Sequence, residues 1–221
     1  MQTKGSEVMP MVHIQDRDNK IRTACMIVVL LVLSAILRFV IRQTIFMVIG
    51  HTAFYDRMAS MTSSLVLTGV LILISHKTGT SLSGIPQHLS WSYVVMEIIF
   101  SIGLWGNYTD NLTGMAVLLY SCVVTPVFEE IMFRGYIWNR ISEVCSNRWV
   151  VYGTVTILFG LWHLAYMDSL AFHVESGLFP IMVWKVITGL CFGLILGAVR
   201  MKSSNCFATM LVHGALNLFA R

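Results

Sequence analysis

Long runs of apolar residues recur along this chain, and most have the length of a helix that crosses a lipid bilayer. Such a helix needs about 20 mostly apolar residues, and only helices and closed barrels can span lipid. The runs predict helices over residues 23–41, 59–75, 91–106, 112–133, 150–166, 179–199 and 206–219. We therefore expect an all-α, polytopic membrane bundle of about seven transmembrane helices, within a range of six to eight.

The composition supports a membrane protein. Of the 221 residues, 56% are hydrophobic and 12% are charged, and the mean hydropathy is +0.73. A soluble domain carries roughly 25% charged residues, so this chain has too little polar surface for a water-soluble globule of its size. The net charge of +4 is dispersed among apolar segments and forms no basic stripe. The expected environment is the lipid bilayer, and nucleic-acid binding is not expected.

Residues 42–58 do not follow the simple pattern of spans. A short apolar piece, residues 45–50, lies beside His51, Asp56 and Arg57. Three interpretations stay open for this segment: an interfacial helix, a lengthened second span, or an eighth element.

The Lys and Arg residues predict the orientation in the membrane. Cytoplasmic loops are enriched in these residues. The loops 107–111 and 167–178 contain no Lys or Arg, whereas the segments on the other side of the predicted bundle contain Lys4, Arg17, Lys20, Arg22, Lys77, Arg140, Arg148, Arg200 and Lys202. The exceptions to this bias are Arg42 and Arg57 in the segment 42–58 and Arg221 at the end. We expect a multi-pass protein of the cell membrane with its N-terminus in the cytoplasm.

Three of the apolar runs carry, within the run or at its end, a pair of residues four positions apart that includes an ionisable side chain. Residues at this spacing share one face of a helix. The pairs are Glu130 and Arg134, Phe159 and His163, and His213 and Asn217. Glu129 lies about 100° around the helix from Glu130, so it faces elsewhere. Ionisable residues are costly at membrane depth and mark functional sites there.

The three motifs fall at similar depths. With a rise of 1.5 Å per residue, Glu129, His163 and His213 lie ~18, ~20 and ~15 Å from the inner ends of their helices. A shared pocket at membrane depth is the geometric expectation. By contrast, Glu97, Lys185 and Arg38 have no evident partner, and we expect structural or snorkelling roles for them.

A second set of small residues points to packing. Gly189, Gly193 and Gly197 recur on one stripe of the sixth predicted span. Small residues at this spacing let a neighbouring helix approach closely, so we expect a packing seam there.

The order EExxxR, FxxxH, HxxxN within residues 112–219 resembles the CAAX-protease and bacteriocin-processing family, called CPBP or Abi, of intramembrane proteases. The resemblance implies a helical bundle and hydrolysis of a peptide bond. It divides the chain into a cytoplasmic N-terminal segment (1–22), accessory transmembrane helices (23–111) and a CPBP-like catalytic four-helix core (112–219).

The site hypothesis combines this resemblance with the residue types. Glu129 is expected to take a proton from water that His163 helps to hold, and His213 and Asn217 are expected to donate hydrogen bonds to the oxyanion. Supporting roles around these four are expected for Glu130, Arg134 and Phe159. A metal is the open alternative, because Glu129, His163 and His213 are a possible His₂Glu set for Zn²⁺.

The expected function is an intramembrane endopeptidase that acts on a membrane-associated peptide or protein. The short loops favour a bacterial protein, which points to peptide maturation or bacteriocin-related processing. The alternative is a non-proteolytic immunity or regulatory membrane protein with the same fold. A proton-coupled transporter fits poorly, because the sequence shows no inverted repeat.

Overall fold

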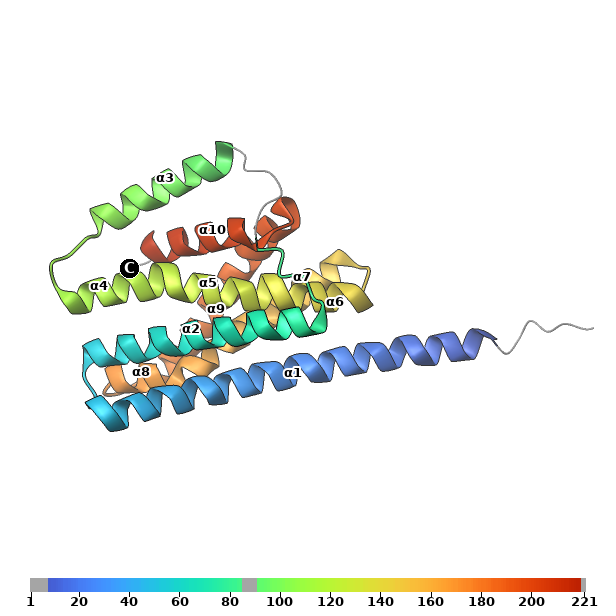
Figure 1. Ribbon diagram of the computed structural model, residues 1–221, viewed down its shortest axis with the longest axis horizontal. Helices are drawn as coiled ribbons and strands as arrows, with labels where there is room; N and C mark the ends of the chain where they lie inside the picture. Colours follow the sequence, from blue (N-terminus) through green and yellow to red (C-terminus); the bar gives the residue numbers. More distant parts are fainter. Residues whose placement is uncertain (1–7, 85–90, 220–221) are drawn as a thin grey trace, which may run out of the picture.

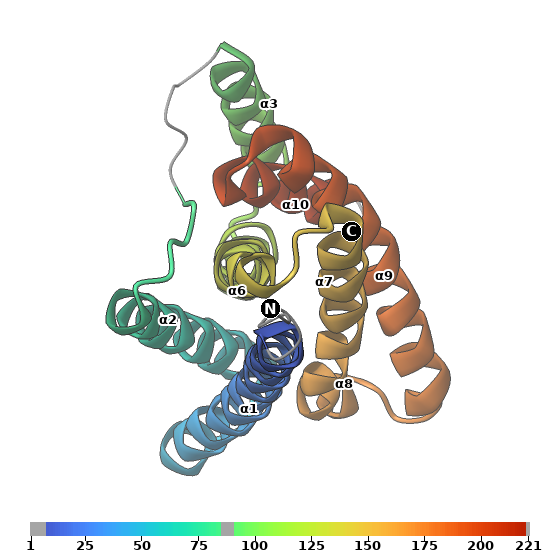
Figure 2. The same cartoon turned by 90° about the vertical axis from the view of Figure 1, so that its right-hand side faces the viewer.

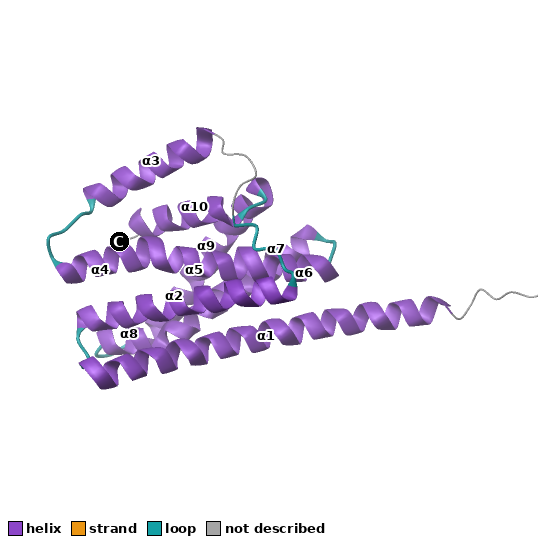
Figure 3. Ribbon diagram, in the orientation of Figure 1, coloured by secondary structure: helices purple, strands orange, loops and turns teal. Residues whose placement is uncertain are grey.

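The computed structural model describes residues 8–84 and 91–219, with side chains from residue 17 onward, and all its regular elements in these ranges are helical (Figure 3). Five helical segments are long and apolar enough to cross a membrane: Arg17–Ile49, Ala53–Thr78, Leu112–Val144, Arg148–His173 and Leu178–Ser203. Two shorter apolar helices, Trp91–Gly106 and Cys206–Phe219, complete the set. The all-α membrane bundle of about seven helices is confirmed.

The helices run back and forth along one axis (Figure 1). The elements in chain order are α1 (Val8–Ile49), α2 (Ala53–Thr78), α3 (Trp91–Gly106), α4 (Leu112–Leu119), η1 (Tyr120–Val124), α5 (Thr125–Glu130), η2 (Ile131–Ile137), α6 (Trp138–Val144), α7 (Arg148–Trp162), η3 (His163–Tyr166), α8 (Met167–His173), α9 (Leu178–Ser203) and α10 (Cys206–Phe219). The elements from α4 to α6 form one continuous span, which we call the central helix. Seen end-on in Figure 2, its α6 end is surrounded by α1, α2, α7 and α10.

The segment 42–58 is shared between the first two helices. Helix α1 continues to Ile49, and α2 begins at Ala53 after a turn in which Gly50 has a φ of 80°. The side chain of Thr52 caps α2 by accepting a hydrogen bond from the backbone N–H of Tyr55. Of the three interpretations, the lengthened second span is correct in part, because the other half of the segment lengthens the first helix.

Buried charges tie α1, α2 and α8 together at this end of the bundle. Arg42 lies 2.7 Å from a carboxylate oxygen of Asp56 and 2.7 Å from one of Asp168. Arg38 lies 2.8 Å from the other oxygen of Asp168 and has the structural role expected for it. Desolvating such charges is costly, and paired geometry is what makes the burial tolerable. We call these four residues the charge cluster.

The glycine stripe of α9 is the expected packing seam. A Cβ atom at Gly193 would lie 2.9 Å from the Thr156 side chain, and one at Gly197 would lie 2.4 Å from the Tyr152 ring. Both neighbours belong to α7. Because the glycines have no side chains, α9 packs in direct contact with α7.

Candidate active site

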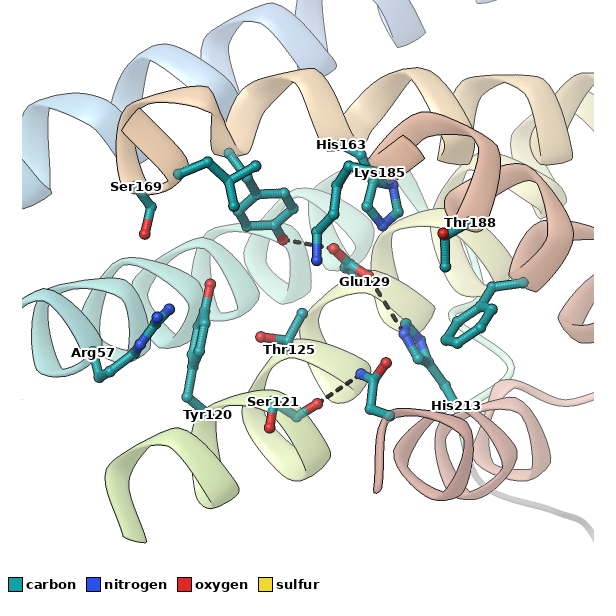
Figure 4. A pocket seen from close by; sticks show the side chains of 14 residues that line it. Arg57, Tyr120, Ser121, Thr125, Glu129, His163, Ser169, Lys185, Thr188 and His213 are labelled. Carbon is teal, nitrogen blue, oxygen red and sulfur yellow. Dashed lines mark hydrogen bonds and ion pairs between the residues drawn. The ribbon is translucent and has the colours of Figure 1, made fainter. Parts of the chain in front are cut away.

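A cavity of about 330 Å³ lies among the central helix, α2, η3, α8, α9 and α10 (Figure 4). The four residues expected to be catalytic all line it, although they come from three separate spans. The full lining is Arg57, Tyr120, Ser121, Thr125, Glu129, His163, Tyr166, Ser169, Leu170, Lys185, Thr188, Phe192, His213 and Asn217. The expected shared pocket is therefore present, and most of the residues around it have polar side chains.

The central helix changes its hydrogen-bond register just before the glutamates. In the π-helical turn η1, the backbone N–H of Thr125 bonds to the carbonyl of Tyr120. The next donor in this register would be Pro126, which has no N–H. The carbonyl of Ser121 accepts instead from Nδ2 of Asn217 at 2.7 Å. Because Pro126 cannot donate, the Ser121 carbonyl is left without a backbone partner and binds Asn217 instead. The altered turn therefore positions one of the predicted catalytic side chains.

Helix α10 approaches the same turn closely. A Cβ atom at Gly214 would lie 2.5 Å from the carbonyl oxygen of Cys122. In a regular α-helix that carbonyl would accept from residue 126, which is the proline. Gly214 therefore allows α10 to contact the altered turn and brings His213 and Asn217 into the cavity.

Glu130 is fully buried and anchors two side chains. Its Oε1 accepts a hydrogen bond from Arg134 at 2.9 Å, as the four-residue spacing predicted. The same oxygen accepts from Nδ1 of His213 at 2.9 Å. The Arg134 guanidinium lies 4.2 Å from the centroid of the Phe159 ring, a cation–π contact. Glu130, Arg134 and Phe159 thus support the cavity without lining it.

Glu129 points into the cavity, and its two carboxylate oxygens have different neighbours. Oε1 accepts a hydrogen bond of 2.6 Å from the hydroxyl of Tyr166. Oε2 lies 3.7 Å from Nε2 of His213. The side chain is almost completely buried, so Oε2 is the oxygen left to act on a molecule in the cavity.

The His163 ring is fixed by its own helix and by α9. Its Nδ1 donates to the carbonyl of Phe159 at 2.9 Å, because a carbonyl can only accept. A Cβ atom at Gly189 would lie 2.6 Å from that Nδ1, so Gly189 leaves the space that the ring occupies. In the neutral ring, Nε2 then carries the lone pair.

Tyr166 is a cavity residue that the sequence interpretation missed. Besides its bond to Glu129, its hydroxyl accepts from Nε1 of Trp162 at 3.2 Å. The guanidinium of Arg38 lies 4.4 Å from the centroid of its ring. Because Tyr166 follows His163 by three residues, a search for polar residues at helical spacing from His163 would have found it.

Lys185 is the second cavity residue that was missed. It was expected to be structural or to snorkel, but its side chain lines the cavity from α9. The available signal was a single lysine about a third of the way along an apolar span, which is a functional hypothesis by default.

Residues 110–219 match the family model described as type II CAAX prenyl endopeptidase Rce1-like. The chain belongs to this family. The match starts at the central helix and includes every residue of the three motifs. At family level the chain is therefore a CAAX-type intramembrane protease, and its helices make it a multi-pass membrane protein.

A curated relative is similar over a wider region. The UPF0177 protein YxdF of Lactococcus lactis subsp. lactis (strain IL1403) is 23% identical over 141 residues, which cover 59% of this chain and 68% of the relative. No solved structure matches the chain.

Zn²⁺ is the metal that the residue types of this site suggest. Glu129, His163 and His213 have suitable donor atoms, and both rings have Nδ1 engaged as metal-bound imidazoles commonly do. However, among the side chains that the structure describes, in residues 17–84 and 91–219, no three His, Cys, Asp or Glu side chains come close enough together to hold one ion. The arrangement does not fit a closed metal site, so the side chains alone are assigned to the reaction. A role for Zn²⁺ stays a prediction.

Proposed function

We propose that this CAAX-type protease is an intramembrane endopeptidase that uses Glu129 to activate water. The observation that carries the proposal is the convergence of Glu129, His163, His213 and Asn217 on one cavity within a membrane bundle. The substrate would be a peptide or protein associated with the membrane, because the cavity lies between apolar helices.

The first step takes a proton from water. Oε2 of Glu129 accepts it, since Tyr166 occupies Oε1. Nε2 of His163 accepts the second water hydrogen and so orients the oxygen toward the peptide carbonyl carbon. The C–O bond forms as the carbonyl becomes an oxyanion. The proton held by Glu129 then passes to the leaving amide nitrogen as the C–N bond breaks, which restores the carboxylate.

The oxyanion would be stabilised from α10. Asn217 uses one amide hydrogen for Ser121, and its second hydrogen is the candidate donor. For His213 to donate through Nε2 while Nδ1 donates to Glu130, the ring must carry both hydrogens.

The cellular setting is also proposed. The Lys and Arg distribution supports insertion in the cell membrane with the N-terminus in the cytoplasm. Bacterial peptide maturation or bacteriocin-related processing is the expected role. The alternative is a non-proteolytic immunity or regulatory protein that uses the same cavity to bind a peptide.

The test compares cleavage of a degenerate library of short peptides, made with and without an S-farnesyl cysteine, by purified protein in lipid nanodiscs. Glu129→Gln keeps the size and the bond to Tyr166 but removes the base, so cleavage should fall at least ~100-fold. The matched control is Glu97→Gln, which changes an exposed glutamate of α3 outside the cavity and should cleave like wild type. Unchanged cleavage by Glu129→Gln would contradict the mechanism, and peptide binding without cleavage by wild type would favour the alternative.

A further inference from the structure

Arg38 of α1 is fully buried, and it contacts the chain on both sides of Tyr166. One nitrogen, Nη1, donates to the backbone carbonyl of Ala165 at 2.8 Å and to Oδ1 of Asp168 at 2.8 Å. Hydrogen bonds in which an ionised group takes part are the strong ones. Arg38 therefore holds the turn that carries Tyr166 from a helix far away in the sequence.

The rest of the guanidinium lies against the Tyr166 ring. Its central carbon is 4.4 Å from the ring centroid, and within the described part of the chain its Nε and Nη2 atoms donate to no other group. Buried donors without a partner are costly, whereas a cation over an aromatic face is attracted to it, most strongly when both are desolvated. The tyrosine ring is therefore the partner of this half of the guanidinium.

Tyr166 connects this contact to the proposed base. Its hydroxyl donates to Oε1 of Glu129 at 2.6 Å, so the aromatic ring lies between a cation at its face and a carboxylate at its hydroxyl. Groups in such a chain polarise one another where the dielectric constant is low. The cation makes the hydroxyl a stronger donor, and its contacts with the turn keep the ring in the position from which the hydroxyl reaches Glu129.

Arg42 provides the comparison within the same charge cluster. It also pairs with Asp168, at 2.7 Å, but its aromatic contact is with Phe46, whose ring centroid lies 5.3 Å away. Asp168 would therefore keep an arginine if Arg38 were replaced. What distinguishes Arg38 is its contact with the turn and the ring of Tyr166.

We propose that Arg38 is a positioning residue for the protease reaction, which acts through Tyr166 and holds Glu129 with Oε2 toward the cavity. This inference rests on the proposed function and adds a residue of α1, which lies outside the matched family region 110–219. A residue that serves only the ion pair with Asp168 would instead contribute to stability and leave the catalytic step unchanged.

The kinetic test is a double-mutant cycle between Arg38→Met and Tyr166→Phe, with cleavage measured in nanodiscs. Arg38→Met removes the charge and should lower kcat about 5- to 30-fold with little change in KM, the range that a desolvated cation–π contact supplies. In the Tyr166→Phe protein, which has no hydroxyl to position, the same change should lower kcat less than about twofold. Equal losses in the two backgrounds would overturn the proposal.

Arg42→Met is the matched control, because it removes the other arginine bonded to Asp168. Its effect on kcat should be the same with and without Tyr166→Phe, since its ring contact is with Phe46. A coupling as large as that of Arg38 would mean that the whole cluster acts together, and it would overturn the specific role of Arg38.

A second variant covers the case in which Arg38→Met does not fold. Arg38→Lys keeps a positive charge beside Asp168, but a lysine cannot bond to the backbone of the turn and cover the ring of Tyr166 at once. The same cycle is then run with Arg38→Lys. A kcat loss that depends on the Tyr166 hydroxyl supports the proposal, and equal losses overturn it.

A spectroscopic cycle separates this proposal from the proposed function, because it needs no cleavage. The tyrosines are labelled as 3-fluorotyrosine, and the ¹⁹F NMR signal of Tyr166 is the one that Tyr166→Phe removes. Glu129→Gln should shift this signal in wild-type protein and in Arg42→Met, and the shift should be largely lost in Arg38→Met. That result supports the placement of Glu129 by Arg38 even if wild-type protein cleaves nothing, in which case only the protease proposal fails. An equal shift in all three backgrounds overturns the positioning role whether or not cleavage occurs.

Discussion

The hydroxyl of Tyr166 donates a 2.6 Å hydrogen bond to Oε1 of Glu129, across 37 residues of sequence. This contact makes the two oxygens of the carboxylate unequal. One is held by the protein, and the other lies beside His213 at the cavity. The orientation of the proposed base is therefore set by a residue outside the three sequence motifs.

Tyr166→Phe removes only this hydroxyl. We expect kcat to fall about 10- to 100-fold with little change in KM, because the bond to a charged oxygen orients the base and does not hold the substrate. The variant also loses the bond from Nε1 of Trp162, so its free energy of unfolding in detergent should fall by about 1–3 kcal/mol, without loss of the fold. Tyr152→Phe is the control, since its hydroxyl bonds to the Leu194 carbonyl away from the cavity. A wild-type kcat for Tyr166→Phe would show that the contact is incidental.

Glu130 and Arg134 form a fully buried ion pair. Removal of either residue leaves the other charge buried without this partner. Glu130→Ala and Arg134→Ala should each lower the free energy of unfolding by about 3–5 kcal/mol, and activity should fall with it. The measurement is thermal or denaturant unfolding in detergent. The double variant should lose less than the sum of the two single losses, because it leaves neither charge alone. Strict additivity would mean that the two residues act independently.

Asn217 has two tasks in the proposed mechanism, and Asn217→Ala tests both. Loss of the oxyanion donor should cut kcat by ~10²–10³ with little change in KM. Loss of the bond to the Ser121 carbonyl should lower the free energy of unfolding by about 1 kcal/mol. A stability loss with an unchanged kcat would confine Asn217 to a structural role.

Removal of bound metal tests whether Zn²⁺ takes part in the reaction. We expect purified protein to stay active after treatment with 1,10-phenanthroline and to contain little zinc by elemental analysis, because the side-chain donors do not converge on a common point in the described ranges. Activity that is lost with the chelator and restored by added Zn²⁺ would instead establish a metalloprotease. Loss of bound zinc in His163→Ala or His213→Ala would then identify the ligands.

The sequence predicted those features that depend on local spacing. The apolar runs predicted the helices, and the four-residue spacings predicted the pair of Glu130 with Arg134 and the contact of His163 with the turn of Phe159. The comparison of depths predicted that three spans would contribute to one pocket, which the cavity confirms.

The contacts that were missed join residues far apart in the chain. Glu129 and Tyr166 are 37 residues apart in the chain. Helical spacing relates Tyr166 to His163, but it does not show that the Tyr166 hydroxyl reaches Glu129. The bond between Glu130 and His213 spans 83 residues and depends on the close approach of α10 at Gly214. Lys185 was expected to be structural or to snorkel because it had no evident partner in the sequence. A one-dimensional pattern does not show which side of a span faces a cavity, and the structure places Lys185 in the cavity lining.

The charge cluster limits how freely this protease can be divided. Arg38 and Arg42 come from α1, which lies outside the family match, yet they pair with Asp168, which follows the Tyr166 turn by two residues. A truncated protein starting at residue 110 would leave Asp168 without either arginine and would remove the cation above the Tyr166 ring. The half of the chain that carries the motifs therefore depends on α1. A chimaera that fuses residues 110–219 to another membrane anchor would need two arginines at the same depth as Arg38 and Arg42.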